Sequence, residues 1–218
     1  MLRFDIAYAT SRLAQYLSNP STIHLSAAKH VLRYLCGYPD LGVTYSSANI
    51  NALNTFPLIY SDASFASDPD DRKSTTGWLT LYNGGVISHS SKKQDLIALS
   101  TMESEYAALC EGVREATFQF KLLQSLNPSF YYFPVVHTDS KPAFDHVKNN
   151  VHHARTKHFD LKLSYVRQAY NSGNVDIIQV PSEEQLADIL TKPLSNHKHH
   201  DALRALNFDV INSGNCDV

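Results

Sequence analysis

Four acidic residues at separate points of the chain are the strongest candidates for chemistry. Asp62 and Asp139 each follow an apolar, strand-like run, whereas Glu105 and Asp188 lie in the first turns of helix-like runs. If the strands lie side by side and the helices pack beside them, the four carboxylates meet at one sheet edge. Carboxylates as close together as this raise each other's pKa. Hard divalent cations such as Mg2+ prefer oxygen ligands of this kind. The pattern is typical of a two-metal phosphodiesterase.

Each acid also has a structural role that competes with metal binding. An Asp at the end of a strand is commonly a turn residue, and the helix dipole stabilises Asp188 in a first turn. Ser100 to Glu103 is a capping box, in which Glu103 is expected to bond back to the Ser100 backbone. Glu105 lies about 200° further around the helix. We therefore predict that Glu103 is a cap and Glu105 a ligand.

The elements that position these acids follow from the periodicity after residue 57. The hairpin signal Asn83-Gly84 joins two of the expected strands. The expected order is βββ-α-β-α-α-β-α, which predicts an α/β fold with a mixed five-stranded sheet flanked by helices. Strands are expected at 57–66, 77–82, 86–90, 133–138 and 175–180, and helices at 100–126, 141–149, 155–170 and 181–190.

The first 45 residues have a different pattern. Apolar residues at helical spacing predict one helix over 4–17 and a second that Ser21 caps and Gly37 ends. Two amphipathic helices bury too little to be stable alone, so they are expected to pack on a partner or on the following residues. We predict an appendage at 1–45, a linker at 46–56, a main domain at 57–195, and a C-terminal helix and tail at 196–218.

Composition limits the function classes. The chain has 218 residues, 43% of them apolar, and a formal net charge of −2, which argues against coating nucleic acid through bulk charge. Three scattered cysteines predict a reducing compartment. No run approaches a membrane span, and Arg3 and Asp5 interrupt the N-terminus, so a signal peptide is not expected. Eleven histidines lack zinc spacing with cysteines, and His197 to His200 are expected in a solvated tail.

The motifs and their order resemble the ribonuclease H domain that ends the polyprotein of copia-type retrotransposons (Pseudoviridae). The start of the chain looks like the end of the preceding reverse transcriptase region. The matching stretches are Tyr60-Ser-Asp62-Ala, Asp70-Asp-Arg-Lys-Ser-Thr-Thr-Gly77, Ser90-Ser-Lys-Lys-Gln94, Ala98-Leu-Ser-Thr-Met-Glu-Ser-Glu105-Tyr106, Thr138-Asp139-Ser140, Arg155-Thr-Lys-His-Phe-Asp160 and Ala187-Asp188-Ile-Leu-Thr-Lys-Pro193.

The resemblance implies a Mg2+-dependent endonuclease that cuts the RNA strand of RNA–DNA hybrids during reverse transcription. Asp62, Glu105, Asp139 and Asp188 occupy the metal-binding positions for two ions, with Mn2+ as a substitute. The implied partners are the hybrid and the reverse transcriptase portion of the polyprotein, and the implied location is a cytoplasmic virus-like particle or the nucleus. No Tyr-x-Asp-Asp polymerase motif occurs, so this segment is not expected to polymerise.

Cations and small polar residues around the acids are candidates for gripping the substrate. Phosphates attract basic side chains, and recognition of the 2′-hydroxyl distinguishes RNA. The candidates for phosphate are Arg72, Lys73, Lys92, Lys93, Arg155 and Lys157, and those for sugar hydroxyls are Ser74, Thr75 and Gln94. Asp160 is a further acid, for which a place on a helix surface is expected.

Two alternatives remain open. One is a non-catalytic remnant that keeps the fold or binds nucleic acid. The other is another nuclease on the same sheet, such as an integrase or resolvase, although the positions of Glu105 and Asp188 fit ribonuclease H better. The family often has Asp, Trp and Gly where Ser64, Phe65 and Ser67 stand, and cellular relatives carry a His where Pro181-Ser-Glu-Glu stands.

Overall fold

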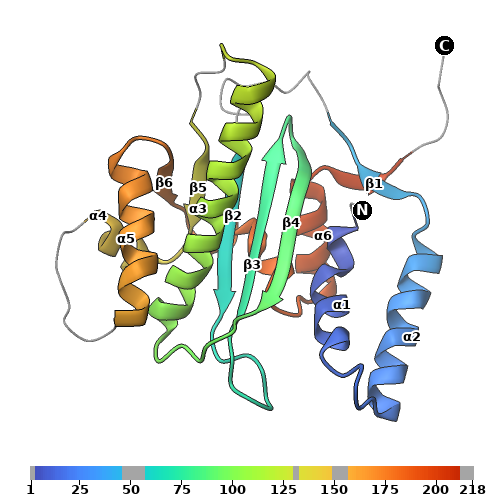
Figure 1. Ribbon diagram of the computed structural model, residues 1–218. Coiled ribbons are helices and arrows are strands. Elements are labelled where there is room, and N and C mark those ends of the chain that lie inside the picture. Colours follow the sequence, from blue (N-terminus) through green and yellow to red (C-terminus); the bar gives the residue numbers. More distant parts are fainter. Residues whose placement is uncertain (1–2, 46–56, 130–132, 149–156, 212–218) are drawn as a thin grey trace, which may run out of the picture.

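The computed structural model describes residues 3–45, 57–129, 133–148 and 157–211, which form a layered α/β structure around a central sheet (Figure 1). The expected linker at 46–56 lies outside the described residues. The strands are β1 Leu41–Val43, β2 Leu58–Ser64, β3 Thr75–Tyr82, β4 Gly85–Lys93, β5 Val135–Thr138, β6 Asp176–Gln179 and β7 Phe208–Val210. The α-helices are α1 Ala7–Ala14, α2 Thr22–Gly37, α3 Thr101–Leu126, α4 Lys141–Lys148, α5 Lys157–Asn171 and α6 Asn196–Ala205. The 3-10 helices of the described residues are η1 Phe4–Ile6, η3 Ser182–Glu184 and η4 Leu186–Leu190.

The main sheet confirms the predicted mixed, five-stranded arrangement. Its strand order is β4-β3-β2-β5-β6. Strands β2, β3 and β4 form an antiparallel meander, whereas β5 runs parallel to both β2 and β6. Asn83 and Gly84 both have positive φ angles, 49° and 76°, as a two-residue type I′ hairpin turn requires. The parallel pairing of β2 with β5 brings the ends that carry Asp62 and Asp139 together.

Helices α3, α4 and α5 cover one face of the sheet (Figure 1). Successive residues of a strand point to opposite faces, so Ile59 and Val136 point towards α3 and pack with its residues Leu109 and Val113. This core holds α3 firmly against β2. The position of Glu105 on α3 is therefore fixed relative to Asp62.

The opposite face of the sheet carries both ends of the described chain. Phe4, Leu79, Leu190, Leu203 and Phe208 are all buried in one cluster. Strand β1 also pairs antiparallel with β7, a two-stranded sheet that the sequence pattern did not predict. Residues on both sides of positions 45 and 195 thus share this core. The assignment of 1–45 to a polymerase-derived remnant stays a prediction.

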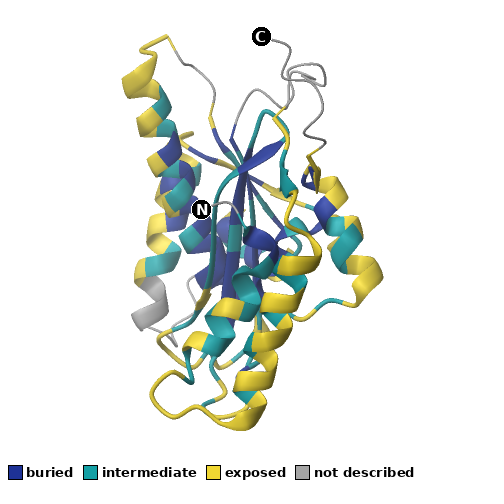
Figure 2. Cartoon of the chain, turned by 90° about the vertical axis from the view of Figure 1, so that its right-hand side faces the viewer, coloured by how far each residue is buried: buried dark blue, intermediate teal, exposed yellow. Residues whose placement is uncertain are grey.

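Helix α2 lies on the outside of this layer. No residue of α2 is buried (Figure 2), and Leu25 and Leu32 on its apolar side are 55% and 60% exposed. The helix begins after Ser21, as expected, because the Ser21 backbone N–H donates to Nδ1 of His24 at 3.1 Å. Leu25 and Leu32 are therefore open to contact with another protein surface.

Three predicted elements differ in the structure. The prediction of one helix over 181–190 is wrong. The chain forms two separate 3-10 helices there, η3 and η4, because Gln185 between them has an extended backbone. The helix expected over 4–17 is shorter, and Leu17 beyond it is 79% exposed. The C-terminal helix expected after residue 195 is α6, but it includes His197 to His200, which were expected in a solvated tail, and His199 contacts the backbone oxygen of Asp5 at 3.2 Å.

Candidate active site

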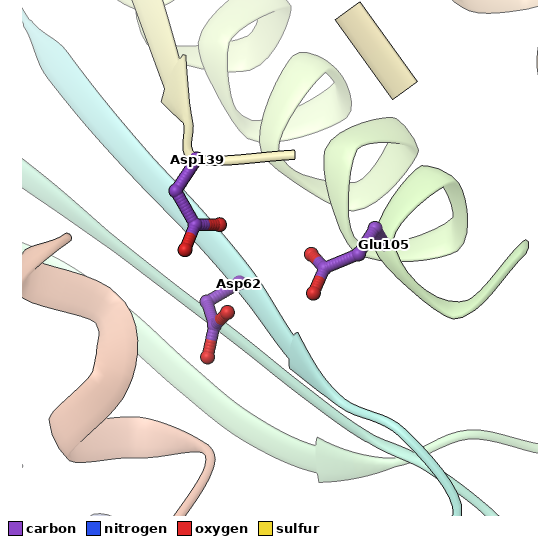
Figure 3. A group of neighbouring side chains, drawn as sticks. All are labelled: Asp62, Glu105 and Asp139. Carbon is purple, nitrogen blue, oxygen red and sulfur yellow. The ribbon is translucent and has the colours of Figure 1, made fainter. Parts of the chain in front are cut away.

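Three of the four predicted acids meet at one end of the sheet (Figure 3). Asp62 lies near the end of β2, Asp139 directly follows β5, and Glu105 lies in the second turn of α3. One carboxylate oxygen from each lies within 4.8 Å of the others. The three side chains point towards a common space (Figure 3). When all three carboxylates are charged, they repel one another, which costs free energy.

Asp62 is the most deeply buried of the three, at 2% exposure. It accepts a hydrogen bond from the Thr191 hydroxyl, and the Lys192 ammonium lies 3.8 Å away. Burial raises the pKa of Asp62 to about 6, against the lowering effects of Lys192 and of the Thr191 hydrogen bond. Asp62 thus keeps its proton to a higher pH than an ordinary aspartate does.

Glu105 is also buried, at 8% exposure. Its position follows from the start of α3, where the Ser100 side chain accepts from the Glu103 backbone N–H at 3.2 Å. Glu103 caps the helix as expected, but it accepts from Leu99 instead of Ser100. Burial, then the charges of Asp62 and Asp139, raise the pKa of Glu105 to about 9. A carboxyl group with this pKa carries a proton at neutral pH until a cation replaces it.

The backbone also reaches into this cluster. The N–H of Ala63, next to Asp62, donates to Oε2 of Glu105 at 3.2 Å. Asp139 is less buried than Asp62 and Glu105, and its Oδ2 accepts from the Ser182 hydroxyl of η3 at 2.8 Å. Ser182 and Ala63 therefore orient two of the carboxylates without neutralising them.

Asp188, the fourth predicted acid, stands apart from the other three. Its Oδ1 forms an ion pair with the Lys192 ammonium at 2.8 Å. The turn that carries it is fixed by Gln185, whose side chain donates to the Ser61 carbonyl at 3.0 Å and accepts from the Ala187 N–H. Asp188 still contributes to the raised pKa of Asp62, so it lies near the cluster. The role of each acid in catalysis stays a prediction.

The donor set suits a divalent cation. Carboxylate oxygens are the ligands that Mg2+ and Mn2+ take in proteins, and Asp62, Glu105 and Asp139 supply them from one small region. The raised pKa values of Asp62 and Glu105 show that the protein alone compensates their charge incompletely. A bound cation would supply that missing positive charge.

The predicted nucleic-acid-binding residues fall into two groups. Arg72 and Lys92 are exposed, and Lys73 has a long ion-pair distance of 3.8 Å to Asp71. By contrast, Ser74 is fully buried and accepts from the Ala66 N–H, and Gln94 donates to Thr76 and to the Ser104 carbonyl. The last two residues serve the internal structure here.

Lys93 and Arg12 share a buried partner. The Lys93 ammonium lies 2.9 Å from Asp68, and the Arg12 guanidinium of α1 contacts the same carboxylate at 2.5 Å. Asp68 is fully buried, and its Oδ1 also accepts from the Asp70 N–H at 2.9 Å. This network ties α1 to the loop that directly follows β2, so Lys93 is engaged in structure. Arg155 lies outside the described residues, as do the side chains of Lys157 and Asp160.

A cavity of about 380 Å3 opens between β3, β4 and the first turns of α3. Lys92 and Lys93 line it together with Trp78, and Glu103 and Glu111 line its helix side. Its wall therefore carries both charges, and no single ligand class follows from it.

Sequence reasoning missed two residues of the site, Thr191 and Lys192. Both stand in the matching stretch from Ala187 to Pro193, three and four residues after Asp188. That spacing places their side chains on the same side of a helical turn as Asp188. It was the signal that could have identified them.

Comparison with known proteins gives relatives among transposons. The chain is 38% identical over 193 residues to the "Retrovirus-related Pol polyprotein from transposon RE2" of Arabidopsis thaliana, and 36% identical over 198 residues to that from transposon TNT 1-94 of Nicotiana tabacum. These matches cover 88% and 90% of the chain but only 13% and 14% of the relatives. A third relative, "Secreted RxLR effector protein 161" of Plasmopara viticola, is 42% identical over 116 residues, which are 53% of this chain and 79% of that protein.

Other comparisons give less. No protein-family model matches the chain. A solved structure of LC11-RNase H1 in complex with an RNA/DNA hybrid is 18% identical with a TM-score of 0.44, over 67% of this chain and 99% of that chain. Among the described residues, no helix has both the length and the apolar character needed to cross a membrane.

Proposed function

This chain belongs, as a segment, to the copia-type retrotransposon Pol polyproteins, and on that premise we propose that it is a ribonuclease H. The proposed reaction is Mg2+-dependent cleavage of the RNA strand of an RNA–DNA hybrid during reverse transcription. Because the segment is a small part of its relatives, their other activities are not transferred to it.

The observation that carries the proposal is the meeting of Asp62, Glu105 and Asp139 within 4.8 Å. These acids come from β2, α3 and the end of β5, so their proximity is a product of the fold and not of local sequence. Divalent cations bound there would make a water molecule a stronger nucleophile and neutralise charge that develops on the phosphate.

The chain's own residues would organise this site. We propose that Asp62, Asp139, Asp188 and Glu105 would hold the cations, which would activate the attacking water and stabilise the leaving oxygen. Ser182 and the Ala63 N–H hold Asp139 and Glu105 in their present orientations. A preorganised site of this kind contributes to catalysis because little rearrangement remains to be done in the transition state.

The exposed cations Arg72 and Lys92 are proposed to contact phosphates of the hybrid. Arg72 lies in the loop between β2 and β3, which begins three residues after Asp62, and Lys92 lies near the end of β4. Such contacts position a duplex and carry no sequence information. Sequence preference is accordingly expected to be weak.

We also propose that the reverse transcriptase portion of the polyprotein packs on α2. Leu25 and Leu32 are apolar side chains that α2 leaves exposed. An amphipathic helix usually buries its apolar side against another part of a protein. Replacing both with Gln should weaken binding of a separately produced polymerase portion without changing hybrid cleavage by this segment. Equal binding of both forms would remove α2 from the interface.

The test of the proposed function is cleavage of a strand-labelled hybrid in Mg2+, with Ca2+ in parallel. Asp62→Asn should still bind hybrid but leave the RNA strand intact, whereas Asp40→Asn, an exposed acid outside the cluster, should cut normally. Undiminished cutting by Asp62→Asn would exclude this site. Binding without cutting by the unmodified chain would instead favour the alternative, a non-catalytic remnant.

A further inference from the structure

We propose that Lys192 is the internal counter-ion of the carboxylate cluster and competes with divalent cations for Asp188 and Asp62. Its ammonium lies 2.8 Å from Asp188 and 3.8 Å from Asp62. The inference rests on the proposed function only in taking the cluster to be a cation site. Lys192 is proposed to set the affinity of that site for divalent cations.

The charges around the cluster leave few other ways to balance it. Asp62 and Glu105 are buried, and Asp139 and Asp188 are half-buried. Among the described residues, Lys192 is the basic side chain that forms ion pairs with these acids. The Lys192 ammonium thus supplies positive charge that partly offsets the repulsion between these carboxylates.

The backbone holds Lys192 in place for this task. The Lys192 N–H donates to the Asp188 carbonyl at 3.2 Å, so the two side chains leave the same turn four residues apart. The preceding residue, Thr191, is fully buried and bonded to Asp62. The Lys192 side chain is 40% exposed, which leaves room for its ammonium to move out when another cation enters.

Lys192 would make two cation positions at these acids unequal. A cation between Asp62, Glu105 and Asp139 meets three carboxylates with no lysine paired to Glu105 or Asp139 in the described part of the chain. A cation between Asp62 and Asp188 must first break the 2.8 Å ion pair with Lys192. Lys192 therefore weakens the second position relative to the first.

The experiment is calorimetric titration of the metal-free protein with Mn2+. Lys192→Met should lower the dissociation constant of the weaker position about fivefold, the effect of removing one partly exposed competing charge. Lys192→Arg keeps the charge and should stay near the unmodified protein. Lys121→Met is the matched control, because it removes an exposed lysine 16 residues further along α3 than Glu105. An isotherm of Lys192→Met equal to that of the control would overturn the proposal.

A second measurement uses the unmodified chain, in case Lys192→Met does not fold without metal. Acetylation of Lys192, followed by mass spectrometry, should accelerate severalfold when Mn2+ displaces the ammonium from Asp188. Acetylation of Lys121 should keep its rate. An unchanged Lys192 rate at saturating Mn2+ would contradict the competition. Failure of the unmodified protein to bind Mn2+ would instead remove the metal site itself, and with it the proposed function.

Discussion

The Thr191 hydroxyl donates a hydrogen bond to the carboxylate of Asp62, although 129 residues separate them in the chain. Thr191 is fully buried, and Asp62 is nearly so. The bond favours the charged form of Asp62 and lowers its pKa against the effect of burial. It thereby connects the turn after η4 to the central strand β2.

Replacing Thr191 with Val should weaken cation binding. Val keeps the shape but lacks the donor, so the charged form of Asp62 loses about 1.5 kcal/mol, which is roughly tenfold in Mn2+ affinity. Thr191→Ser keeps the hydroxyl and should bind nearly as well as the unmodified chain. Calorimetric titration measures both. Equal weakening by Ser and Val would mean that the methyl group matters and the hydrogen bond does not.

Replacing Gly77 with Ala should disturb the packing of Leu190 and Thr191 next to the carboxylate cluster. Gly77 lies opposite Asp62 in the β2–β3 register. A Cβ at Gly77 would lie 2.6 Å from Cγ2 of Thr191 and 2.8 Å from Cβ of Leu190. Overpacking of this kind costs about 1–3 kcal/mol, which urea unfolding would measure as a lower free energy of unfolding.

Two further variants identify the cause of this loss. Gly77→Ala combined with Thr191→Ser removes the methyl group that clashes, and should recover part of the stability. Gly37→Ala is the control, because nothing lies within 4 Å of its new Cβ at the end of α2. If Gly77→Ala were as stable as Gly37→Ala, the close approach of η4 to β3 would be refuted.

The sequence predicted the sheet and three members of the cluster because their signals are local. Asn83-Gly84 specifies a turn by its backbone preferences, and Ser100 specifies the start of α3 by capping it. Once the order of elements is known, the pairing of β2 with β5 brings Asp62 and Asp139 together. Local chemistry and topology were sufficient for this much.

The rest depended on contacts that no local pattern encodes. Gln185 divides the expected last helix because its side chain bonds across to Ser61, 124 residues earlier. The pairing of β1 with β7 joins two short, weakly patterned segments from opposite ends of the described chain. Likewise, the ion pair between Lys93 and Asp68 was not predicted, because the two residues lie 25 positions apart in the chain.

Removing Arg12 should destabilise the protein substantially. Asp68 is fully buried between Arg12 and Lys93, which hold the pKa of Asp68 well below its usual range. Leaving a buried carboxylate with half of its compensation costs about 3 kcal/mol. Arg12→Met should show this loss in urea unfolding, whereas Arg33→Met, exposed on α2, should not. In the double variant with Asp68→Asn, much of the loss should disappear; purely additive losses would show that the two residues are not coupled.

Lys92 and Lys93 should respond differently in hybrid binding. Lys92 is exposed, whereas the Lys93 ammonium pairs with Asp68 and Asp71, both at 2.9 Å. Lys92→Met should reduce the slope of log affinity against log salt by about 0.7–0.9, the effect of one lost phosphate contact. Lys93→Met should chiefly lower stability. The reverse pattern in fluorescence-anisotropy titrations at several salt concentrations would place Lys93, and not Lys92, at the phosphates.

The stability of the metal-free protein should fall as the pH rises above neutrality. The pKa values of Asp62 and Glu105 are raised to about 6 and about 9, from ordinary values of 3.8 and 4.5. The folded state therefore binds more protons than the unfolded chain. This contribution to stability is complete below about pH 4. It is lost as the pH rises through 6 and then 9.

Between pH 7 and pH 9 most of this loss belongs to Glu105. Its slope is at most about 1.4 kcal/mol per pH unit, the value for one proton. Glu105→Gln stays neutral and should flatten the profile of unfolding free energy, whereas Glu103→Gln, at the cap of α3, should leave it unchanged. Saturating Mg2+ should also flatten the profile, because a bound cation replaces the proton that Glu105 otherwise keeps. A metal-free profile that is already flat across this range would mean that Glu105 is ionised throughout, and that the site does not need a cation to balance its charge.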